Sequence, residues 1–292
     1  MKITQVGELR LKLGEGPVWD VAEQALYFTD ILDQRIWRLD PATGATRSWR
    51  FDAKVSAFAL REGGGAIVAL AKGVHLFDFD TGALKLVGDP EPDDPVTQLN
   101  DGKADPAGRF LVGSVASDFK GSDCGLYSVE GGAIRKLDGG FGLTNGPCWS
   151  PDGRTFYFAD SRPMEIYAYD YDVATGQVSN RRLFASTAAL GGIPDGATVD
   201  SEGRVYSAIC NGGVIACWDP DGRLVRTIEA PSRLVTSVMF GGPDLDRLYV
   251  TSIDGSHLPF LPPDAPKDPA DGRLFMIEGL GVSGLPERRF RG

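Results

Sequence analysis

Six short strand-like segments recur along this chain at a nearly constant spacing, and this repeat constrains the fold more than any other feature. Each segment is rich in aromatic and β-branched residues, which favour strands. Most are followed by a second strand-like run and then by a turn signal such as PATGA or DPDGR. The six segments are ALYFTD (25–30), AIVALA (66–71), RFLVGS (109–114), TFYFAD (155–160), RVYSAI (204–209) and RLYVTS (247–252).

The turns that precede these segments define the period of the repeat. Gly65, Gly108, Gly153 and Gly203 are separated by 43, 45 and 50 residues, and Asp246 takes the same place 43 residues later. Six four-stranded units at this spacing are typical of a β-propeller. Sustained helical periodicity is missing, which disfavours a TIM barrel or a doubly wound sheet, and a β-sandwich needs no phased repeat.

The sequence therefore predicts an all-β, six-bladed β-propeller with four-stranded antiparallel blades around a central channel. We expect residues 1–292 to form this single domain. The N-terminal run ITQVGELRL is expected to add an outer strand to the last blade, which would close the ring and cover an exposed strand edge.

An oxygen-bearing side chain recurs at one phase of the repeat, eight residues before the turn position and just before the first strand of a unit. In four of the six units this residue is Glu15, Asn100, Asn145 or Asp195. Because the innermost strands of a propeller line its channel, these side chains would form a ring on one face. Converging carboxylates repel one another unless a cation lies between them, which predicts a divalent metal. The alternative is that these residues only form turns or caps.

Glu15, Asn145 and Asp195 are the predicted metal ligands, and each precedes a glycine that would let the backbone bend tightly. Oxygen ligands alone suit Ca²⁺, Mg²⁺ or Mn²⁺, and such sites also accept Zn²⁺ or Fe²⁺, so the sequence leaves the identity of the one expected ion open.

Composition excludes several classes of partner and location. A formal net charge of −10 argues against nucleic acid and against an anionic membrane surface. We find no signal peptide and no apolar stretch long enough to span a membrane. The four cysteines show no CxxC spacing, which favours reduced thiols and a cytoplasmic protein.

Nucleophilic and nucleotide-dependent chemistry finds little support. The chain has two histidines, His75 in a strand-like run of the second unit and His257 in a proline-rich loop, and it lacks a G-x-S-x-G motif. The phosphate-binding glycine motifs G-x-x-x-x-G-K-[ST] and G-x-G-x-x-G are not found at a strand-to-helix turn. A Ser-His-Asp triad and a nucleotide cofactor are therefore not expected.

Four ordered segments, LGEGPVW, N-D-G-K-x-D-x-x-G-R at 100–109, LTNGPCWSPDG and IPDGATVDSEG, resemble those of the senescence-marker-protein (regucalcin), gluconolactonase and luciferin-regenerating-enzyme family. The resemblance covers essentially the whole chain. It implies one divalent metal at the top of the channel, held by Glu15, Asn145 and Asp195, with Asn100 beside it touching substrate or water. Many members open sugar lactones to aldonic acids, so a small-molecule lactone is the expected partner of a monomer or weak homo-oligomer.

Two positions depart from the family pattern and are predicted to contact substrate together with Asn100. Many members have arginine two residues before the asparagine of the N-D motif, and this chain has Gln98. After GSVASD, Asp118 is the nearest counterpart of the family's acidic residues. Glutamine can hydrogen-bond a hydroxyl group but brings no charge, so the substrate's identity stays open.

Lactone hydrolysis requires an attacking water and a stabilised oxyanion, and a divalent metal can supply both. Asp195 is the best candidate for the general base, because a ligand carboxylate has a second oxygen free to accept a proton. Asp101 is the rival, and it could instead hold the NDG turn. The alternatives are hydrolysis of another ester or a phosphotriester at the same site, or a non-catalytic metal-binding propeller. The long 253–271 loop is interpreted as a lid, a subunit contact or a plain surface excursion.

Overall fold

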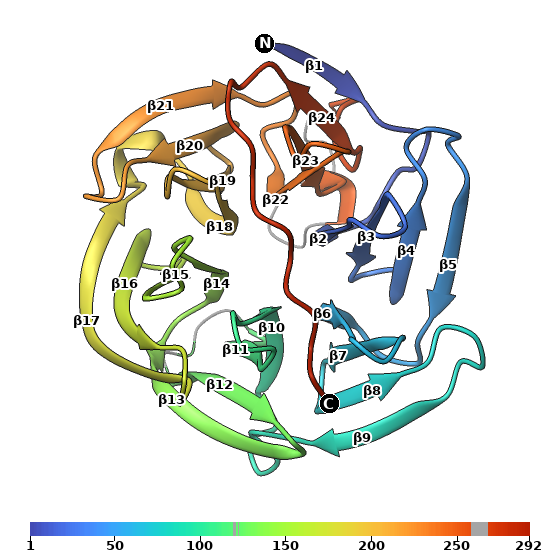
Figure 1. The fold of residues 1–292 in the computed structure, drawn as a ribbon, viewed down its shortest axis with the longest axis vertical. Coiled ribbons are helices and arrows are strands. Elements are labelled where there is room, and N and C mark those ends of the chain that lie inside the picture. Colours follow the sequence, from blue (N-terminus) through green and yellow to red (C-terminus); the bar gives the residue numbers. More distant parts are fainter. Residues whose placement is uncertain (119–120, 122, 258–267) are drawn as a thin grey trace.

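Six four-stranded antiparallel sheets surround a central axis, which confirms the predicted six-bladed β-propeller (Figure 1). The computed structural model describes residues 1–118, 121, 123–257 and 268–292. Each sheet is one blade, and the blades are numbered 1 to 6 in the chain order of their innermost strands. Two three-residue 3₁₀ turns, Ala188–Leu190 and Gly255–His257, complete the regular structure of these residues.

Each blade runs outward from the axis through four strands. The innermost strands are β2 (Gly14–Asp20), β6 (Val55–Leu60), β10 (Thr97–Ala104), β14 (Thr144–Trp149), β18 (Ile193–Val199) and β22 (Val235–Gly241). The second strands are β3 (Ala25–Asp30), β7 (Ala66–Leu70), β11 (Phe110–Ala116), β15 (Thr155–Asp160), β19 (Val205–Cys210) and β23 (Arg247–Ser252). The third strands are β4 (Arg35–Leu39), β8 (Val74–Phe77), β12 (Cys124–Glu130), β16 (Glu165–Asp172), β20 (Val214–Trp218) and β24 (Phe275–Glu278). The outermost strands are β5 (Thr46–Arg50), β9 (Leu84–Gly88), β13 (Ala133–Phe141), β17 (Gln177–Ser186), β21 (Leu224–Glu229) and β1 (Lys2–Gln5).

The segments with the recurring polar residues are themselves the innermost strands, and the six repeated segments of the sequence are the second strands. Our placement of the polar residues before the first strand was therefore wrong. The aromatic and β-branched runs carry the stronger strand signal, whereas innermost strands contain glycine where blades pack closely at the axis. At Gly146, for example, a Cβ atom would lie 2.7 Å from the backbone oxygen of Asp195 on the next blade.

The ring closes between the two ends of the chain. Strand β1 pairs with β24 in an antiparallel register, with Lys2 opposite Glu278 and Gln5 opposite Phe275. The N-terminal run thus supplies the outer strand of blade 6, as the sequence predicts.

The hydrophobic core lies between neighbouring blades. The interfaces between blades hold clusters of buried side chains, with aromatic residues at many of the contacts. Trp19 of blade 1 stacks on Tyr249 of blade 6 with ring centroids 5.4 Å apart, and Phe240 meets Tyr206 of blade 5 edge to face. The inner and second strands are therefore buried on both sides, which explains their nearly continuous apolar and β-branched sequences.

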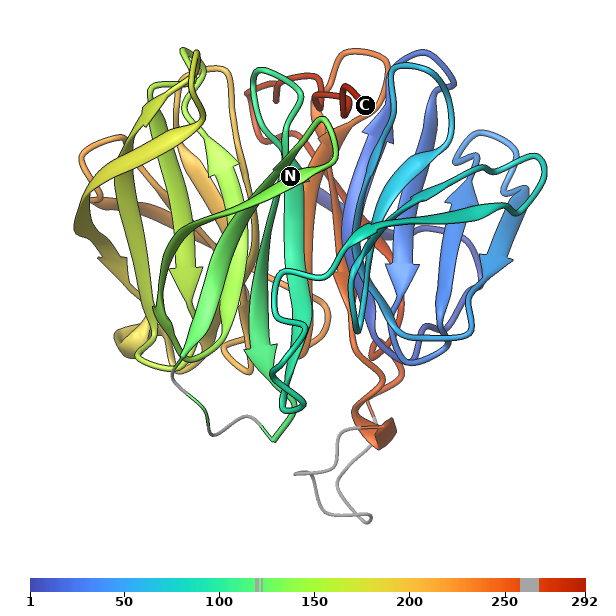
Figure 2. The same ribbon diagram turned by 90° about the horizontal axis from the view of Figure 1, so that it is seen from below.

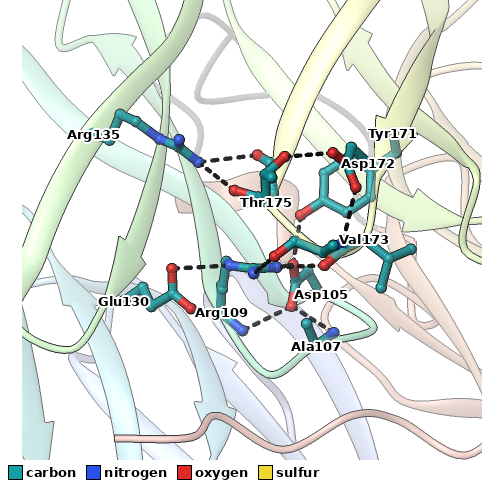
Figure 3. Close-up of polar contacts among 11 residues, drawn as sticks. Asp105, Ala107, Arg109, Glu130, Arg135, Tyr171, Asp172, Val173 and Thr175 are labelled. Carbon is teal, nitrogen blue, oxygen red and sulfur yellow. Dashed lines mark hydrogen bonds and ion pairs between the residues drawn. The ribbon is translucent and has the colours of Figure 1, made fainter.

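A recurring Asp-x-x-Gly-Arg turn connects the first and second strands in blades 3 and 5. In blade 3 the buried Asp105 accepts hydrogen bonds from the backbone N–H groups of Ala107 and Arg109 at 2.8 and 2.7 Å (Figure 3). Arg109 donates to Asp105 at 2.9 Å and to the Val173 carbonyl of blade 4 at 2.9 Å. Tyr171 of blade 4 also donates to Asp105. The second half of the N-D-G-K-x-D-x-x-G-R motif therefore connects blade 3 to blade 4 through hydrogen bonds.

A C-terminal tail (residues 279–292) crosses the whole propeller and was not predicted. Figure 1 shows it passing over the axis, and Figure 2 shows it on one face of the disc. It bonds to the ends of the first strands or to the turns that follow them in five blades, through the contacts Ser201–Ser283, Leu245–Gly284, Asp20–Arg289, Leu60–Phe290 and Gly108–Arg291. We call this side the tail face. The innermost strands begin on the opposite side, the ring face.

All four cysteines are free and buried, in agreement with the predicted reduced thiols. No helix in the described part of the chain has the length and hydropathy that crossing a membrane requires.

Candidate metal centre

The innermost strands place one oxygen-bearing side chain each at the same structural position near the ring face. In every blade the pairing of the first two strands is irregular at this point, and such irregularities redirect side chains. Sequence reasoning found four of the six members and missed Ser56 and Thr236, because hydroxyl residues carry no distinctive signal in a strand. The complete ring is Glu15, Ser56, Asn100, Asn145, Asp195 and Thr236.

Glu15 and Asp195 contact each other across the axis. Both are buried, with 8% and 7% of their surface exposed, and they lie close enough to shift each other's pKa. Burial, followed by the negative charges of Asp195 and Asp101, raises the pKa of Glu15 well above its ordinary value. Burial and then Asp101 raise the pKa of Asp195 in the same way. Two carboxyl groups placed in this way favour protonation of one of them unless a cation lies between them.

This donor set fits a divalent cation. Among the described residues, no lysine or arginine is one of the main groups that shift the pKa values of Glu15 and Asp195. Two buried carboxylates without a positive partner are costly, and a cation bound between them would remove that cost. Among the same residues, no group of three or more His, Cys, Asp and Glu side chains is arranged to hold a metal. The predicted set is different, since it combines two carboxylates with the carboxamide of Asn145.

Asn145 is held in one orientation by its neighbours. Its Nδ2 donates to Ser161 Oγ at 2.9 Å, and Ser161 Oγ in turn donates to the Pro194 carbonyl at 2.6 Å. Asn100 Nδ2 donates to Asn145 Oδ1 at 3.1 Å and to the Thr144 carbonyl at 2.7 Å. Asn145 therefore presents its oxygen on the side of Asn100. Sequence reasoning missed Ser161, because its role depends on a contact between strand ends of one blade.

Asp101 lies one residue beyond the ring and has both carboxylate oxygens engaged. Oδ1 accepts the Gly102 N–H at 2.7 Å, and Oδ2 accepts the Gly146 N–H at 2.9 Å. Burial raises its pKa, while the nearby charge of Lys103 opposes that shift. These contacts fit the alternative in which Asp101 holds the NDG turn and, through Gly146, the backbone beside Asn145.

The glycines after the predicted ligands serve two different needs. Gly16 and Gly146 have φ of 50° and 56°, the left-handed conformation that favours glycine. Gly196 does not have a positive φ. There, a Cβ atom would lie 1.9 Å from Ser237 Oγ on blade 6, so glycine is required by packing. The predicted backbone bend is therefore present after Glu15 and Asn145 and not after Asp195.

The predicted substrate contacts lie toward the ring face. Gln98 is a half-buried residue of β10, opposite Val115 of β11 and two residues before Asn100. Asp118 is exposed, two residues beyond the end of β11. Their roles remain predictions.

Neither histidine belongs to the ring. His75 lies on β8, the third strand of blade 2, and burial lowers its pKa. His257 ends an exposed 3₁₀ turn. Residues 258–267 of the 253–271 loop lie outside the described residues, so its interpretation is not tested.

Comparison with known proteins gives one consistent result. The sequence model of the SMP-30/Gluconolactonase/LRE-like region matches residues 13–254. The chain is 34% identical to regucalcin of Xenopus laevis, over 100% of this chain and 99% of the relative. It is 35% identical to a pentonolactonase of Haloferax volcanii, over 99% of this chain and 98% of the relative.

Solved structures agree with the sequence comparisons. A luciferin-regenerating enzyme superposes with a TM-score of 0.93 at 29% identity, over 100% of this chain and 99% of the other. Regucalcin from Agrobacterium tumefaciens, described as a calcium-binding protein, superposes with a TM-score of 0.92 at 29% identity, over 99% and 97%. The chain therefore belongs to the SMP-30, gluconolactonase and luciferin-regenerating-enzyme family.

Proposed function

We propose that this protein is a lactonase that hydrolyses a sugar lactone to the aldonic acid with the help of one divalent metal. The observation that carries the proposal is the pair of buried carboxyl groups of Glu15 and Asp195, which lie close together and, among the described residues, have no lysine or arginine among the groups that shift their pKa values. The full-length similarity to a pentonolactonase supports the choice of a lactone as substrate.

Glu15, Asn145 and Asp195 would hold the metal, which when bound supplies a Lewis acid for the lactone carbonyl and lowers the pKa of a neighbouring water. Asp195 would accept the proton of the attacking water on the carboxylate oxygen that does not bind the metal. After the acyl C–O bond breaks, Asp195 returns that proton to the ring oxygen, which leaves as a hydroxyl group. Asn100 and Ser161 keep Asn145 in position through their hydrogen bonds to its two side-chain atoms.

A substrate panel tests the reaction class. Purified protein is assayed with several aldonolactones, a chromogenic ester and a phosphotriester, each with and without a chelator. We expect chelator-sensitive hydrolysis that is fastest with an aldonolactone. Faster turnover of the ester or phosphotriester would assign a different hydrolase, and metal binding without any turnover would indicate a binding protein.

We expect no role for histidine in the chemical step. The double change His75→Gln with His257→Gln should leave kcat within about tenfold of the unmodified protein, a barrier change of about 1.4 kcal/mol. Steady-state kinetics with the best aldonolactone measure this. A much larger loss, with metal content and thermal unfolding unchanged, would reveal a histidine base.

Gln98 is expected to form a hydrogen bond with a neutral hydroxyl group of the substrate. A hydrogen bond to a neutral group contributes about 0.5–1.5 kcal/mol, so Gln98→Ala should lower kcat/KM by a few-fold to about tenfold. Gln98→Arg, the residue of many relatives, should be tolerated and should change the ranking of lactones. Metal affinity, measured in parallel, should stay constant in both variants. If neither variant changes the kinetics with any lactone, Gln98 does not contact substrate.

A further inference from the structure

A column of alternating charge connects the tail face with the metal centre. It consists of Glu287 on the C-terminal tail, Lys103 on β10 and Asp101 on the same strand. The Lys103 Nζ lies 3.4 Å from Glu287 Oε1, and the two side chains are only 14% and 15% exposed. Lys103 also donates to the Ala197 carbonyl of blade 5 at 3.2 Å. The tail thus places a carboxylate beside a lysine that lies within the channel.

The column continues from Lys103 to the ring. Asp101 and Lys103 lie close enough for the charge of each to shift the pKa of the other. A small cavity near the axis is lined by all three members of the column together with Gly16 and Ser237. Asp101 then accepts the Gly146 N–H at 2.9 Å, directly beside the predicted ligand Asn145. Successive contacts therefore lead from the tail to a ligand of the metal.

Each member of the column depends on its neighbour for charge balance. A buried ammonium group needs negative partners, and a buried carboxylate needs positive ones. Without Glu287, Lys103 keeps Asp101 as its nearby carboxylate and is free to move toward the carboxylates of the ring. That movement would take the positive charge of Lys103 away from Asp101, which accepts the Gly146 N–H. It would also bring the Lys103 ammonium group closer to Glu15 and Asp195, where it would compete with the metal.

We propose that Glu287 is a positioning residue for the metal centre, acting from the opposite face through Lys103 and Asp101. The C-terminal tail is then a functional part of the site as well as a strap across the blades. The proposal rests on the proposed function only in taking Glu15, Asn145 and Asp195 as the metal ligands.

The test compares two conservative changes in the contacts that tether the tail. Glu287→Gln removes the charge inside the channel. Glu62→Gln removes an exposed ion pair with Arg291, 2.8 Å long, on the same tail. Titrations of the metal-free proteins with Ca²⁺ and with Mn²⁺ give the affinity, and thermal unfolding without metal gives the stability. We expect Glu287→Gln to weaken metal binding about tenfold, while Glu62→Gln stays within about twofold.

Further measurements separate positioning from simple loss of stability. Lys103→Met should weaken binding similarly, and adding Glu287→Gln to it should cause little additional loss, because the two residues act as one unit. For the Glu287→Gln variant, kcat should recover at saturating metal while kcat/KM at limiting metal stays low. Glu287→Asp should restore part of the affinity.

Equal metal affinities in the Glu287→Gln and Glu62→Gln variants would overturn the proposal, even if both variants melt at a lower temperature. Additive effects of the Lys103 and Glu287 changes would also overturn it. Since affinity is measured without a lactone, a protein that binds metal but hydrolyses no lactone would contradict the proposed function and leave this test intact.

Discussion

Replacing Asp195 by asparagine is expected to lower kcat for lactone hydrolysis by at least about 10³-fold. A positioned general base contributes about 10²–10⁴ in rate, and asparagine cannot accept the proton. The change also removes one of the two negative charges that would hold the metal, which weakens its binding. Steady-state kinetics at increasing metal concentration separate the two effects, because the loss of the base persists at saturating metal.

Asp101→Asn is the matched comparison for this prediction. Both oxygens of Asp101 accept backbone N–H groups at 2.7 and 2.9 Å, so they are occupied in the metal-free site. We expect a smaller loss of kcat in this variant than in Asp195→Asn once metal is saturating. If Asp101→Asn is the more damaging change with metal content intact, Asp101 is the base and Asp195 serves as a ligand only.

Removing the metal is expected to abolish lactone hydrolysis and to make the stability of the protein depend on pH. In the metal-free protein the pKa values of Glu15 and Asp195 are raised above their unfolded values. Their contribution to stability is therefore fully present below the ordinary pKa of a carboxyl group. It is lost as pH rises through the raised values, because the folded state must then release protons and hold two adjacent negative charges.

Bound metal takes the place of these protons, so the loaded protein should lack this loss of stability. At a metal concentration 100 times Kd, binding stabilises the folded state by about 2.7 kcal/mol, which corresponds to a rise in Tm of roughly 5 °C or more for a chain of this size. Thermal unfolding from pH 5 to pH 8, with and without chelator, measures the difference.

Glu15→Gln provides the control for the pH effect. In the metal-free state this variant should be more stable than the unmodified protein at neutral pH, since it removes one of two facing carboxylates, and it should gain little from added metal. A metal-free protein whose Tm is the same at pH 5 and pH 8 would contradict the assignment of a shared proton to Glu15 and Asp195.

The sequence was sufficient to predict the propeller because its signals are local and repeated. The turn positions before the strand-like segments recur at 43 to 50 residues from Gly65 on, and five of the six blades form from four strands that are consecutive in the chain. The same phase placed Glu15, Asn100, Asn145 and Asp195 in one ring. Local signals misled at one point, because the second strands carry a stronger strand signal than the innermost strands. Glycine is needed there for close approach between blades, as at Gly196 and Ser237.

What the sequence by itself determined was the number of blades, the second strand of each blade and four of the six polar residues of the ring. Only the tertiary structure decided which groups touch those residues. Ser161 orients Asn145, Asp101 bonds to the next blade, and Glu287 reaches Lys103 from the far end of the chain. Such contacts join segments with no periodic relation in sequence, and their geometry exists only once the blades have packed into a closed ring.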